Sequence, residues 1–288
     1  MNDKKLPYLL IGVPIIFALL IIFSPVIYAI YLSLFKLMYF GSGPFIGLGN
    51  YDRMIHDRIF VRSLLTSIKF GFSSLGITFT LAMFFALALN KLGSKGTSLL
   101  TLLLIPWAMS RIVGSMLWKW IFTDFEGGIL FYFMSVIGIS YQSILGNPTS
   151  AFWALVFNAV WRTVGFATIL ILAGMKSIPD NLYRSASVDG SSKIHQFFRI
   201  TVPLLKIPIL IVIAQLTMSY FNEITLPLIL TGGGPAYATN TLSLFAYTKG
   251  FTNFEFGYSN ALVITQFLIN LILLLIYIRA LKMREIYN

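Results

Sequence analysis

Apolar runs separated by short polar and charged stretches dominate the pattern of this chain. A helix needs about 20 mostly apolar residues to cross the hydrocarbon core of a bilayer. Six runs meet that length, and inside lipid a helix is the conformation that satisfies all of the backbone hydrogen-bonding groups of a single segment. The pattern predicts an all-α integral membrane protein with one transmembrane domain, residues 1–288, and six transmembrane helices at about 9–35, 64–90, 99–122, 151–175, 205–230 and 257–281.

A seventh apolar stretch, Gly127–Gly146, carries no charge and is also long enough to cross a membrane. It contains four glycines and three serines, together with Tyr141 and Gln142, which make its transfer into lipid unfavourable. We therefore expect this stretch to form an interfacial or re-entrant helix.

Basic residues decide between six and seven spans, because cytoplasmic loops of membrane proteins are enriched in Lys and Arg. With six spans and cytoplasmic N- and C-termini, 12 of the 21 basic residues lie on the inner side and five on the outer side. A seventh span would reverse the side of the 176–206 loop and of the C-terminus. The inner residues are Lys4, Lys5, Lys91, Lys95, Lys176, Arg184, Lys193, Arg199, Lys206, Arg279, Lys282 and Arg284, and the outer residues are Lys36, Arg53, Arg58, Arg62 and Lys249.

The composition agrees with a multi-pass protein of a cell membrane, plasma or inner. Hydrophobic residues make up 57% of the chain and charged residues 11%, against about 25% charged residues in soluble domains. The net charge of +11 raises nucleic-acid binding as an alternative. The basic residues follow the predicted topology and form no continuous stripe, so we expect membrane lipid and no nucleic acid as a partner.

The longest inner loop, 176–204, carries more signals of local structure than a simple connection needs. Pro179 and Asp180 are typical of a helix start. The dipeptide Asp189–Gly190 favours a turn, and its glycine can end a helix in the left-handed conformation. Ser191 and Ser192 can cap a second helix running to about residue 200. These signals predict a helix, a glycine corner and another helix, whereas the alternative is a solvated loop that only joins two spans.

This loop and several other segments carry a resemblance to a known family. In the loop, the matching positions are Asp189, Gly190, Phe198, Ile200 and Pro203. They resemble the cytoplasmic signature of binding-protein-dependent ABC importer permeases, which reads Glu-Ala-Ala, three residues, Asp-Gly, and then Phe, Ile and Pro. The segments "FIGLGNYDRM", "LLIPWAMSRIVGSMLWKWIF" and "FNEITLPLILTGGGPAYATNTLSLFAYTKGF" are similar to the carbohydrate-uptake branch of that family, the MalF and UgpA kind.

The resemblance implies a type I ABC importer transmembrane fold and an assembly of several proteins. A second related permease subunit would complete the translocation pathway, forming a heterodimer with this chain. Two ABC ATPase subunits would bind ATP and Mg²⁺, and an extracytoplasmic solute-binding protein would deliver a sugar or sugar-like solute. Residues 182–200 would couple the ATPase to the spans, through Arg184, Ser185, Ala186, Asp189, Gly190 and Phe198.

The chain departs from the family signature where Glu-Ala-Ala is usual, since Arg184, Ser185 and Ala186 stand there. A glutamate at the first position favours a basic partner surface, whereas an arginine favours an acidic or neutral one. We therefore expect the cognate ATPase to present a carboxylate opposite Arg184.

No catalytic, cofactor or metal site is expected in this chain itself. The sequence has no G-x-x-x-x-G-K-[ST] phosphate loop, no H-E-x-x-H motif and no cysteine. Its two histidines, His56 and His195, fall in loops predicted on opposite sides of the membrane. We predict a non-catalytic membrane subunit, with ATP hydrolysis in a partner.

Three ionisable residues, Arg111, Arg162 and Glu223, fall inside predicted spans, where charges are costly and usually face a cavity or a partner. Glu223 and Arg162 either pair with each other or line the substrate pathway, and the sequence leaves both alternatives open. Amide, carboxylate and aromatic groups suit the hydroxyls and ring faces of sugars. The predicted pathway residues are Tyr220, Asn222, Glu223, Thr225, Asn158 and Arg162.

An ion-coupled secondary transporter is the main alternative to an ATP-driven importer. Such a protein would show paired inverted halves with broken helices and central acidic residues. The sequence has one central acid, Glu223, and no obvious repeat. A structural scaffold, the third alternative, would not need the Asp-Gly loop. We therefore predict the permease subunit of an ATP-driven, solute-binding-protein-dependent importer.

Overall fold

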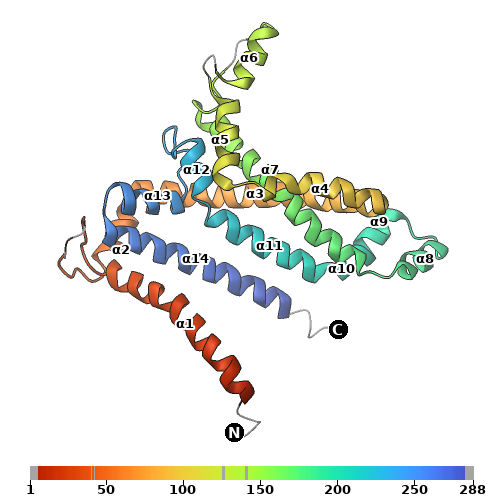
Figure 1. Ribbon diagram of the computed structural model, residues 1–288, viewed down its shortest axis with the longest axis horizontal. Coiled ribbons are helices and arrows are strands. Elements are labelled where there is room, and N and C mark those ends of the chain that lie inside the picture. Colours follow the sequence, from red (N-terminus) through yellow and green to blue (C-terminus); the bar gives the residue numbers. More distant parts are fainter. Residues whose placement is uncertain (1–5, 40, 42, 125–126, 140–141, 283–288) are drawn as a thin grey trace. The chain divides into compact units, whose positions relative to one another are not determined.

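The computed structural model describes residues 6–39, 41, 43–124, 127–139 and 142–282. Within these ranges every regular element is helical (Figure 1). In chain order the elements are α1 (Leu6–Ser33), α2 (Gly49–His56), α3 (Arg58–Lys91), α4 (Ser94–Ala108), α5 (Arg111–Phe122), α6 (Ile129–Val136), α7 (Pro148–Lys176), α8 (Asp180–Val188), α9 (Lys193–Gln196), the π-helix η1 (Phe197–Thr201), α10 (Val202–Leu204), α11 (Lys206–Phe221), α12 (Thr225–Leu230), α13 (Leu242–Tyr247), the π-helix η2 (Thr248–Thr252) and α14 (Phe256–Lys282).

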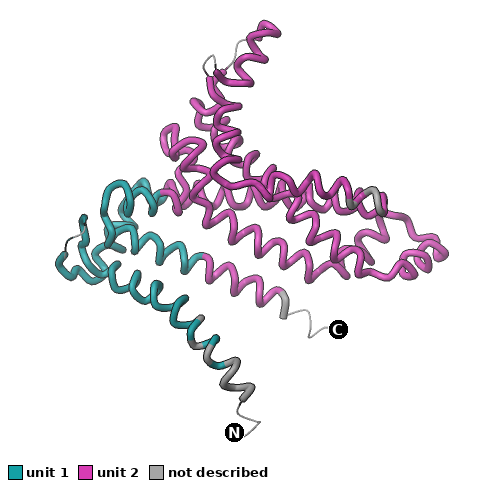
Figure 2. The backbone as a smooth tube through the Cα atoms, in the orientation of Figure 1, with its two compact units in different colours: residues 1–61, 245–269 teal, residues 62–244, 270–288 magenta. Residues whose placement is uncertain are grey.

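The chain divides into two compact units, coloured separately in Figure 2. One unit comprises residues 1–61 and 245–269, and the other comprises residues 62–244 and 270–288. The loop that resembles the permease signature and the charged residues of the predicted spans all lie in the second unit.

In the first unit, a buried amide on α2 holds the end of α1. The side chain of Asn50 donates hydrogen bonds to the carbonyl oxygens of Ser33 (2.8 Å) and Phe35 (2.9 Å). The hydroxyl groups of Tyr51 and Ser33 lie 2.8 Å apart. These bonds satisfy carbonyl groups at a helix end, which have no partner within the helix itself.

A charged cluster in the same unit joins α2 to the start of α14. The carboxylate of Glu255 forms ion pairs with Arg53 and with Lys249, the latter at 3.0 Å. The guanidinium of Arg53 lies over the ring of Tyr258, 4.2 Å from its centroid. The Tyr258 hydroxyl in turn donates to the carboxylate of Asp57 at 2.9 Å. Every acidic side chain of this cluster therefore has a partner.

In the second unit, α7 is the central helix of the core. It begins where the sequence supplies a cap, since the Asn147 side-chain oxygen accepts from the backbone N–H groups of Thr149 (2.9 Å) and Ser150 (3.4 Å). Pro148 occupies the first helical position, where its missing N–H costs nothing. Leu155 and Ile171 of this helix are fully buried.

Helices α4 and α7 pack with their backbones in contact. A Cβ atom at Gly165 of α7 would overlap the backbone carbonyl of Leu103 of α4. Small residues at such contacts are typical of helix packing in membranes, because close approach adds van der Waals contact. Any side chain larger than that of glycine at position 165 would force the two helices apart.

Three helices within the described ranges are each long and apolar enough to cross a membrane: α3, α7 and residues Phe256–Ala280 of α14. They coincide with the predicted spans 64–90, 151–175 and 257–281. Two bent helix pairs raise the number of candidate spans to five if each pair is counted as one span. The six spans and the cytoplasmic position of both termini therefore stay predictions. The terminal basic residues Lys4, Lys5 and Arg284 lie outside the described residues.

The span predicted at about 99–122 is not one continuous helix, although its two halves together are apolar enough to count as one broken span. The segments Ser98–Ala108 and Arg111–Phe122 meet at an angle of 90°. Ser110, between them, has an extended backbone (φ −54°, ψ 136°). Pro106 lies close before the break and removes a backbone donor from the last turn of α4.

The helix predicted at about 205–230 is also broken. The chain bends by 70° between Leu204 and Lys206, next to the prolines at 203 and 208. The helix α11 then ends at Phe221, and α12 begins only at Thr225. Proline kinks helices because it lacks the N–H and clashes with the preceding turn, which accounts for the first of these two breaks.

The apolar stretch at 127–146 contains one short helix, α6, of eight residues. At 1.5 Å per residue it is about 12 Å long, well short of the roughly 30 Å of a hydrocarbon core. This length agrees with the expectation that the stretch does not form a spanning helix. Residues 140 and 141 of the stretch lie outside the described residues.

Candidate functional site

The predicted corner of the 176–204 loop is confirmed. Helix α8 ends at Val188, and Gly190 has a φ of +77°, in the left-handed region. The N–H of Ser191 donates to the carbonyl of Ala186 (2.9 Å), and the N–H of Gly190 donates to that of Ser187 (3.2 Å). This pair of bonds is the Schellman arrangement that ends a helix at a glycine.

A second helix follows the corner, as predicted, although it is shorter than expected. The Ser192 hydroxyl oxygen accepts from the N–H of His195 (3.3 Å) and caps α9. Helix α9 ends at Gln196 rather than near residue 200, because the chain widens there into the π-helix η1 before α10. The buried Gln196 side chain donates to the Ser187 hydroxyl (2.9 Å) and thereby ties α9 to α8.

The helices α8 and α9 present an exposed surface with apolar side chains. Val188 is 88% exposed and Ile194 is 73% exposed. Large apolar side chains gathered in this way are typical of a surface that another protein covers. Of the residues predicted to couple to an ATPase, five are exposed and Ala186 is half-buried; the exposed ones are Arg184, Ser185, Asp189, Gly190 and Phe198.

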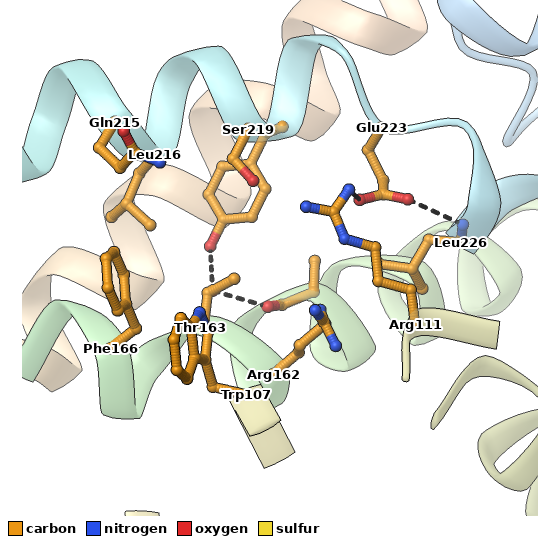
Figure 3. Close-up of a pocket in the computed structure, with 12 residues that line it drawn as sticks. Trp107, Arg111, Arg162, Thr163, Phe166, Gln215, Leu216, Ser219, Glu223 and Leu226 are labelled. Carbon is orange, nitrogen blue, oxygen red and sulfur yellow. Dashed lines mark hydrogen bonds and ion pairs between the residues drawn. The ribbon is translucent and has the colours of Figure 1, made fainter. Parts of the chain in front are cut away.

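A cavity of about 230 Å³ lies between α4, α5, α7, α11 and α12 (Figure 3). Three charged side chains line it: Arg111 at the start of α5, Arg162 on α7, and Glu223 between α11 and α12. Arg162 is the midpoint of α7, with 14 residues of the helix on either side (148–161 and 163–176). If α7 crosses the membrane, this charge lies near the centre of the bilayer.

Glu223 and Arg162 form no direct ion pair with each other, whereas a role of either residue in the substrate pathway stays a prediction. The Glu223 carboxylate pairs with Arg111, with 3.3 Å between Oε2 and Nη1, and not with Arg162 (Figure 3). Its other oxygen, Oε1, accepts from the N–H of Leu226 (3.1 Å) and so caps α12. Arg162 instead donates through Nη1 to the carbonyl of Met109 (2.9 Å), at the break between α4 and α5.

Tyr220 also lines the cavity, but its hydroxyl is engaged in the packing of three helices. The oxygen lies 2.6 Å from the hydroxyl of Thr78 on α3 and 2.6 Å from that of Thr163 on α7. The residue is 3% exposed. A hydroxyl has one donor and two acceptor sites, so these contacts use most of its capacity.

The other three predicted pathway residues do not line this cavity. Asn158 is buried on α7, and its side-chain nitrogen has no hydrogen-bond partner among the described residues. The exposed Asn222 accepts from the amide of Asn270 at 2.8 Å. Thr225 is half-buried at the start of α12.

The lining also contains residues that were not predicted, among them an aromatic pair and two polar residues of α11. Trp107 and Phe166 stack on each other with ring centroids 5.0 Å apart and an interplanar angle of 9°. Gln215 and Ser219 add polar groups from α11. The two polar residues lie one helical turn apart on a mostly apolar helix, and Glu223 follows four positions further on. That spacing was the available signal.

The described residues contain no group of three or more His, Cys, Asp and Glu side chains placed to hold a metal ion. The cavity is lined by guanidinium, carboxylate, amide, hydroxyl and aromatic groups. Groups of this kind can bind a polar solute through hydrogen bonds and ring contacts.

Comparison with protein families gives one match that covers most of the chain. Residues 78–280 match the family described as "Binding-protein-dependent transport system inner membrane component". The matched region includes the 176–204 loop and every residue that lines the cavity.

Full-length relatives and a solved structure agree with this match. The chain is 34% identical to the trehalose/maltose transport system permease protein MalF of Thermococcus litoralis, covering 99% of this chain and 96% of that protein. It is 30% identical to the sulfoquinovosyl glycerol transport system permease protein SmoG of Agrobacterium fabrum, covering 99% and 93%. Its fold matches a chain of a bacterial ABC transporter involved in the import of the acidic polysaccharide alginate, with a TM-score of 0.83, 21% identity and 96% coverage of both chains.

Proposed function

Because the chain belongs to the family of binding-protein-dependent transport system inner membrane components, we propose that it is a permease subunit of an ATP-driven importer of a sugar or sugar-like solute. The observation that carries this proposal is the exposed helix, glycine corner and helix of α8 and α9. Val188 and Ile194 are apolar and uncovered there, as expected for a surface that an ATPase subunit grips.

A helix gripped by a moving ATPase can pass its movement to the spans as a rigid body. The Gln196 side chain holds α9 against α8, so the two helices form one unit rather than a loose connection. The Tyr183 hydroxyl lies 3.0 Å from that of Thr201, which joins α8 to η1 and so towards α11. ATP binding can shift the transporter between two conformations only if the ATPase and the permease make different contacts in the two.

The proposed assembly has this chain and a related permease subunit around one pathway, with two ATPase subunits on the cytoplasmic side. The ATPase subunits bind ATP and Mg²⁺ and carry out the hydrolysis. A solute-binding protein delivers the solute from outside, and the chain crosses the cell membrane several times. The sugar-like class is supported by the two relatives named for transport of trehalose/maltose and of sulfoquinovosyl glycerol.

The cavity is proposed as part of the solute pathway. Arg162, Glu223 and Tyr220 line it together with the stacked rings of Trp107 and Phe166. Guanidinium and carboxylate groups suit the hydroxyl groups of a sugar, and the aromatic pair suits an apolar ring face.

Reconstitution of the assembled transporter in proteoliposomes tests the function. We expect solute uptake only when ATP is enclosed with the ATPase subunits and the solute-binding protein is present on the other side. Uptake driven by a proton or sodium gradient in the absence of ATP would favour the secondary-transporter alternative and contradict the proposal.

A further inference from the structure

The charges that line the cavity do not cancel. Arg111 and Arg162 contribute two positive charges and Glu223 contributes one negative charge, so the lining contributed by this chain has a net charge of +1. A guanidinium stays protonated in proteins, so Arg162 cannot lose its charge by deprotonation. A charge near the middle of a membrane is costly unless an opposite charge or a polar cavity compensates it.

Most of the guanidinium donors in the cavity remain available to a solute. A guanidinium has five N–H groups. Among the described residues, the bonds of these two groups are one from Arg162 to the Met109 carbonyl and one from Arg111 to Glu223. The Met109 carbonyl is neutral, and the Glu223 carboxylate makes its ion-pair contact with Arg111, so a single negative charge serves both arginines.

We propose that the solute is an acidic carbohydrate, whose anionic group (a sulfonate, a phosphate or a carboxylate) binds Arg162 in this cavity. The planar fork of an arginine binds such oxyanions through two parallel, charge-assisted hydrogen bonds. The stacked rings of Trp107 and Phe166 would contact the sugar ring, and the exposed amide of Gln215 would bind its hydroxyls. This inference rests on the proposed function and narrows its solute class.

The named relatives do not decide the charge of the solute. One is named for trehalose and maltose, which are neutral, and one for sulfoquinovosyl glycerol, which carries a sulfonate. The solved transporter of similar fold imports an acidic polysaccharide. The unbalanced arginine of this chain is the observation that favours the acidic class.

The experiment uses the assembled transporter in proteoliposomes with enclosed ATP. Its first measurement is the mass and charge of the solute that the cognate solute-binding protein carries after purification under native conditions. Its second is the uptake of that solute and of its neutral counterpart, in which the acid is esterified or replaced by hydroxyl. We expect an anionic solute, and we expect wild-type transporter to favour it over the neutral counterpart.

Variants separate a solute contact from a structural role. Arg162→Gln is expected to lower the ratio of acidic to neutral uptake by about tenfold, the usual effect of losing one charge-assisted contact, whereas Arg162→Lys should keep most of that ratio. A purely structural role would lower both uptakes equally and leave the ratio unchanged. Lys119→Gln, which removes a positive charge from α5 at a position that does not line this cavity, serves as the control and should leave the ratio unchanged.

The outcomes distinguish this inference from the function on which it rests. ATP-driven uptake of a neutral native solute, or an unchanged ratio in Arg162→Gln, would overturn the acidic-solute proposal and leave the permease function standing. Absence of any ATP-dependent uptake by an assembled complex with its loaded binding protein would overturn both.

Discussion

The Oε2 atom of Glu223 lies 3.3 Å from Nη1 of Arg111, although 112 positions separate the two residues in the chain. Arg111 opens α5 directly after the break in the third predicted span, and Glu223 lies in the break between α11 and α12 in the fifth. The ion pair therefore connects the two places where predicted spans are interrupted. Both residues lie in the second unit, within a cavity that is proposed to carry solute.

The two oxygens of Glu223 have separable roles, which two substitutions can distinguish. Glu223→Gln removes the ion pair but keeps an oxygen that can accept from Leu226, whereas Glu223→Ala removes both. We expect Glu223→Ala to be less stable than Glu223→Gln by about 1 kcal/mol, the usual value of a helix cap. Thermal unfolding of the purified complex measures the difference. Equal melting temperatures in the two variants would mean that the cap contributes nothing.

The pair itself is tested by adding Arg111→Gln to Glu223→Gln. Because the Arg111 side chain is 52% exposed, solvent screens the interaction and we expect a coupling free energy of about 1 kcal/mol or less. The double variant should be destabilised by less than the sum of the two single variants. Strict additivity would show that the two side chains do not interact in the assembled protein.

Removal of the Tyr220 hydroxyl is expected to destabilise the second unit. Tyr220→Phe leaves the hydroxyls of Thr78 and Thr163 without this partner in a buried place, at a cost of about 1–3 kcal/mol. Tyr277→Phe is the matched control, because the Tyr277 hydroxyl contacts one threonine, Thr217 at 2.8 Å, and is less buried. Thermal unfolding should rank the Tyr220 variant below the Tyr277 variant, and the reverse order would contradict the structural role.

The corner at Gly190 is expected to be essential for binding an ATPase. Proline cannot adopt a φ of +77° and lacks the N–H that Gly190 donates to Ser187, so Gly190→Pro should abolish co-purification of the ATPase. Gly190→Ala should be milder, with a strain of about 1–2 kcal/mol from the left-handed conformation.

A glycine of the same geometry provides the control for that experiment. Gly138, after α6, has a φ of +73° and donates its N–H to Ser135 three residues before it. Gly138→Pro imposes the same backbone conflict in a segment not proposed to meet the ATPase. We expect it to leave ATPase co-purification intact, and a loss equal to that of Gly190→Pro would point to a general folding defect.

The exposed Arg184 is expected to meet a carboxylate of the ATPase subunit. Arg184→Glu should weaken ATPase binding by about tenfold, since like charges at an interface are unfavourable. Lys176→Glu, the same charge change at the exposed end of α7, should have a smaller effect. Titration of detergent-purified subunits measures both affinities. A lysine or arginine opposite Arg184 in the native complex would contradict this expectation.

Acid is expected to weaken the first unit through Glu255. Burial raises the pKa of this carboxyl, but ion pairs with Arg53 and Lys249 outweigh that effect, so its pKa lies below the ordinary 4.5. A group whose pKa is lowered by folding contributes stability above its unfolded pKa and loses it as the pH falls through the folded pKa. The melting temperature should therefore be constant from pH 7 to about pH 5 and fall below that.

The substitution Glu255→Gln checks the origin of this pH dependence. The variant should melt at a lower temperature than the wild type at pH 7, and the difference between the two should shrink as the pH falls below about 4. A difference that stayed constant down to pH 3 would show that another group is responsible.

Local features of the fold were predictable from the sequence, whereas its long-range features were not. The corner at Gly190 and the cap at Ser192 depend on residues within a few positions of each other, so turn and cap preferences were sufficient. The three long apolar helices that could each cross a membrane were predictable from the length of their apolar runs alone.

The helix breaks and the ion pair between Arg111 and Glu223 could not be predicted from local sequence patterns. Hydropathy alone gave no sign of the 90° bend in 99–122, since Ser110 is not a strong helix breaker and Pro106, which weakens the last turn of α4, can also lie within a continuous span. The partner of Glu223 depends on that bend, since Arg111 starts the helix that follows it. The sequence identified the charged residues of the spans but not which of them would pair.

The absence of a side chain at Gly165 limits how the second unit can change shape. The backbone of α7 at Gly165 lies directly against the Leu103 carbonyl, with no side chain between the two helices that could rearrange to let them slide. We therefore expect residues 94–108 to move with α7 as one rigid body. The extended link at Ser110 and the short segment between α11 and α12 are then the places left to act as hinges during a transport cycle. Arg111 and Glu223 sit on those hinges, so each opening would stretch or break their contact.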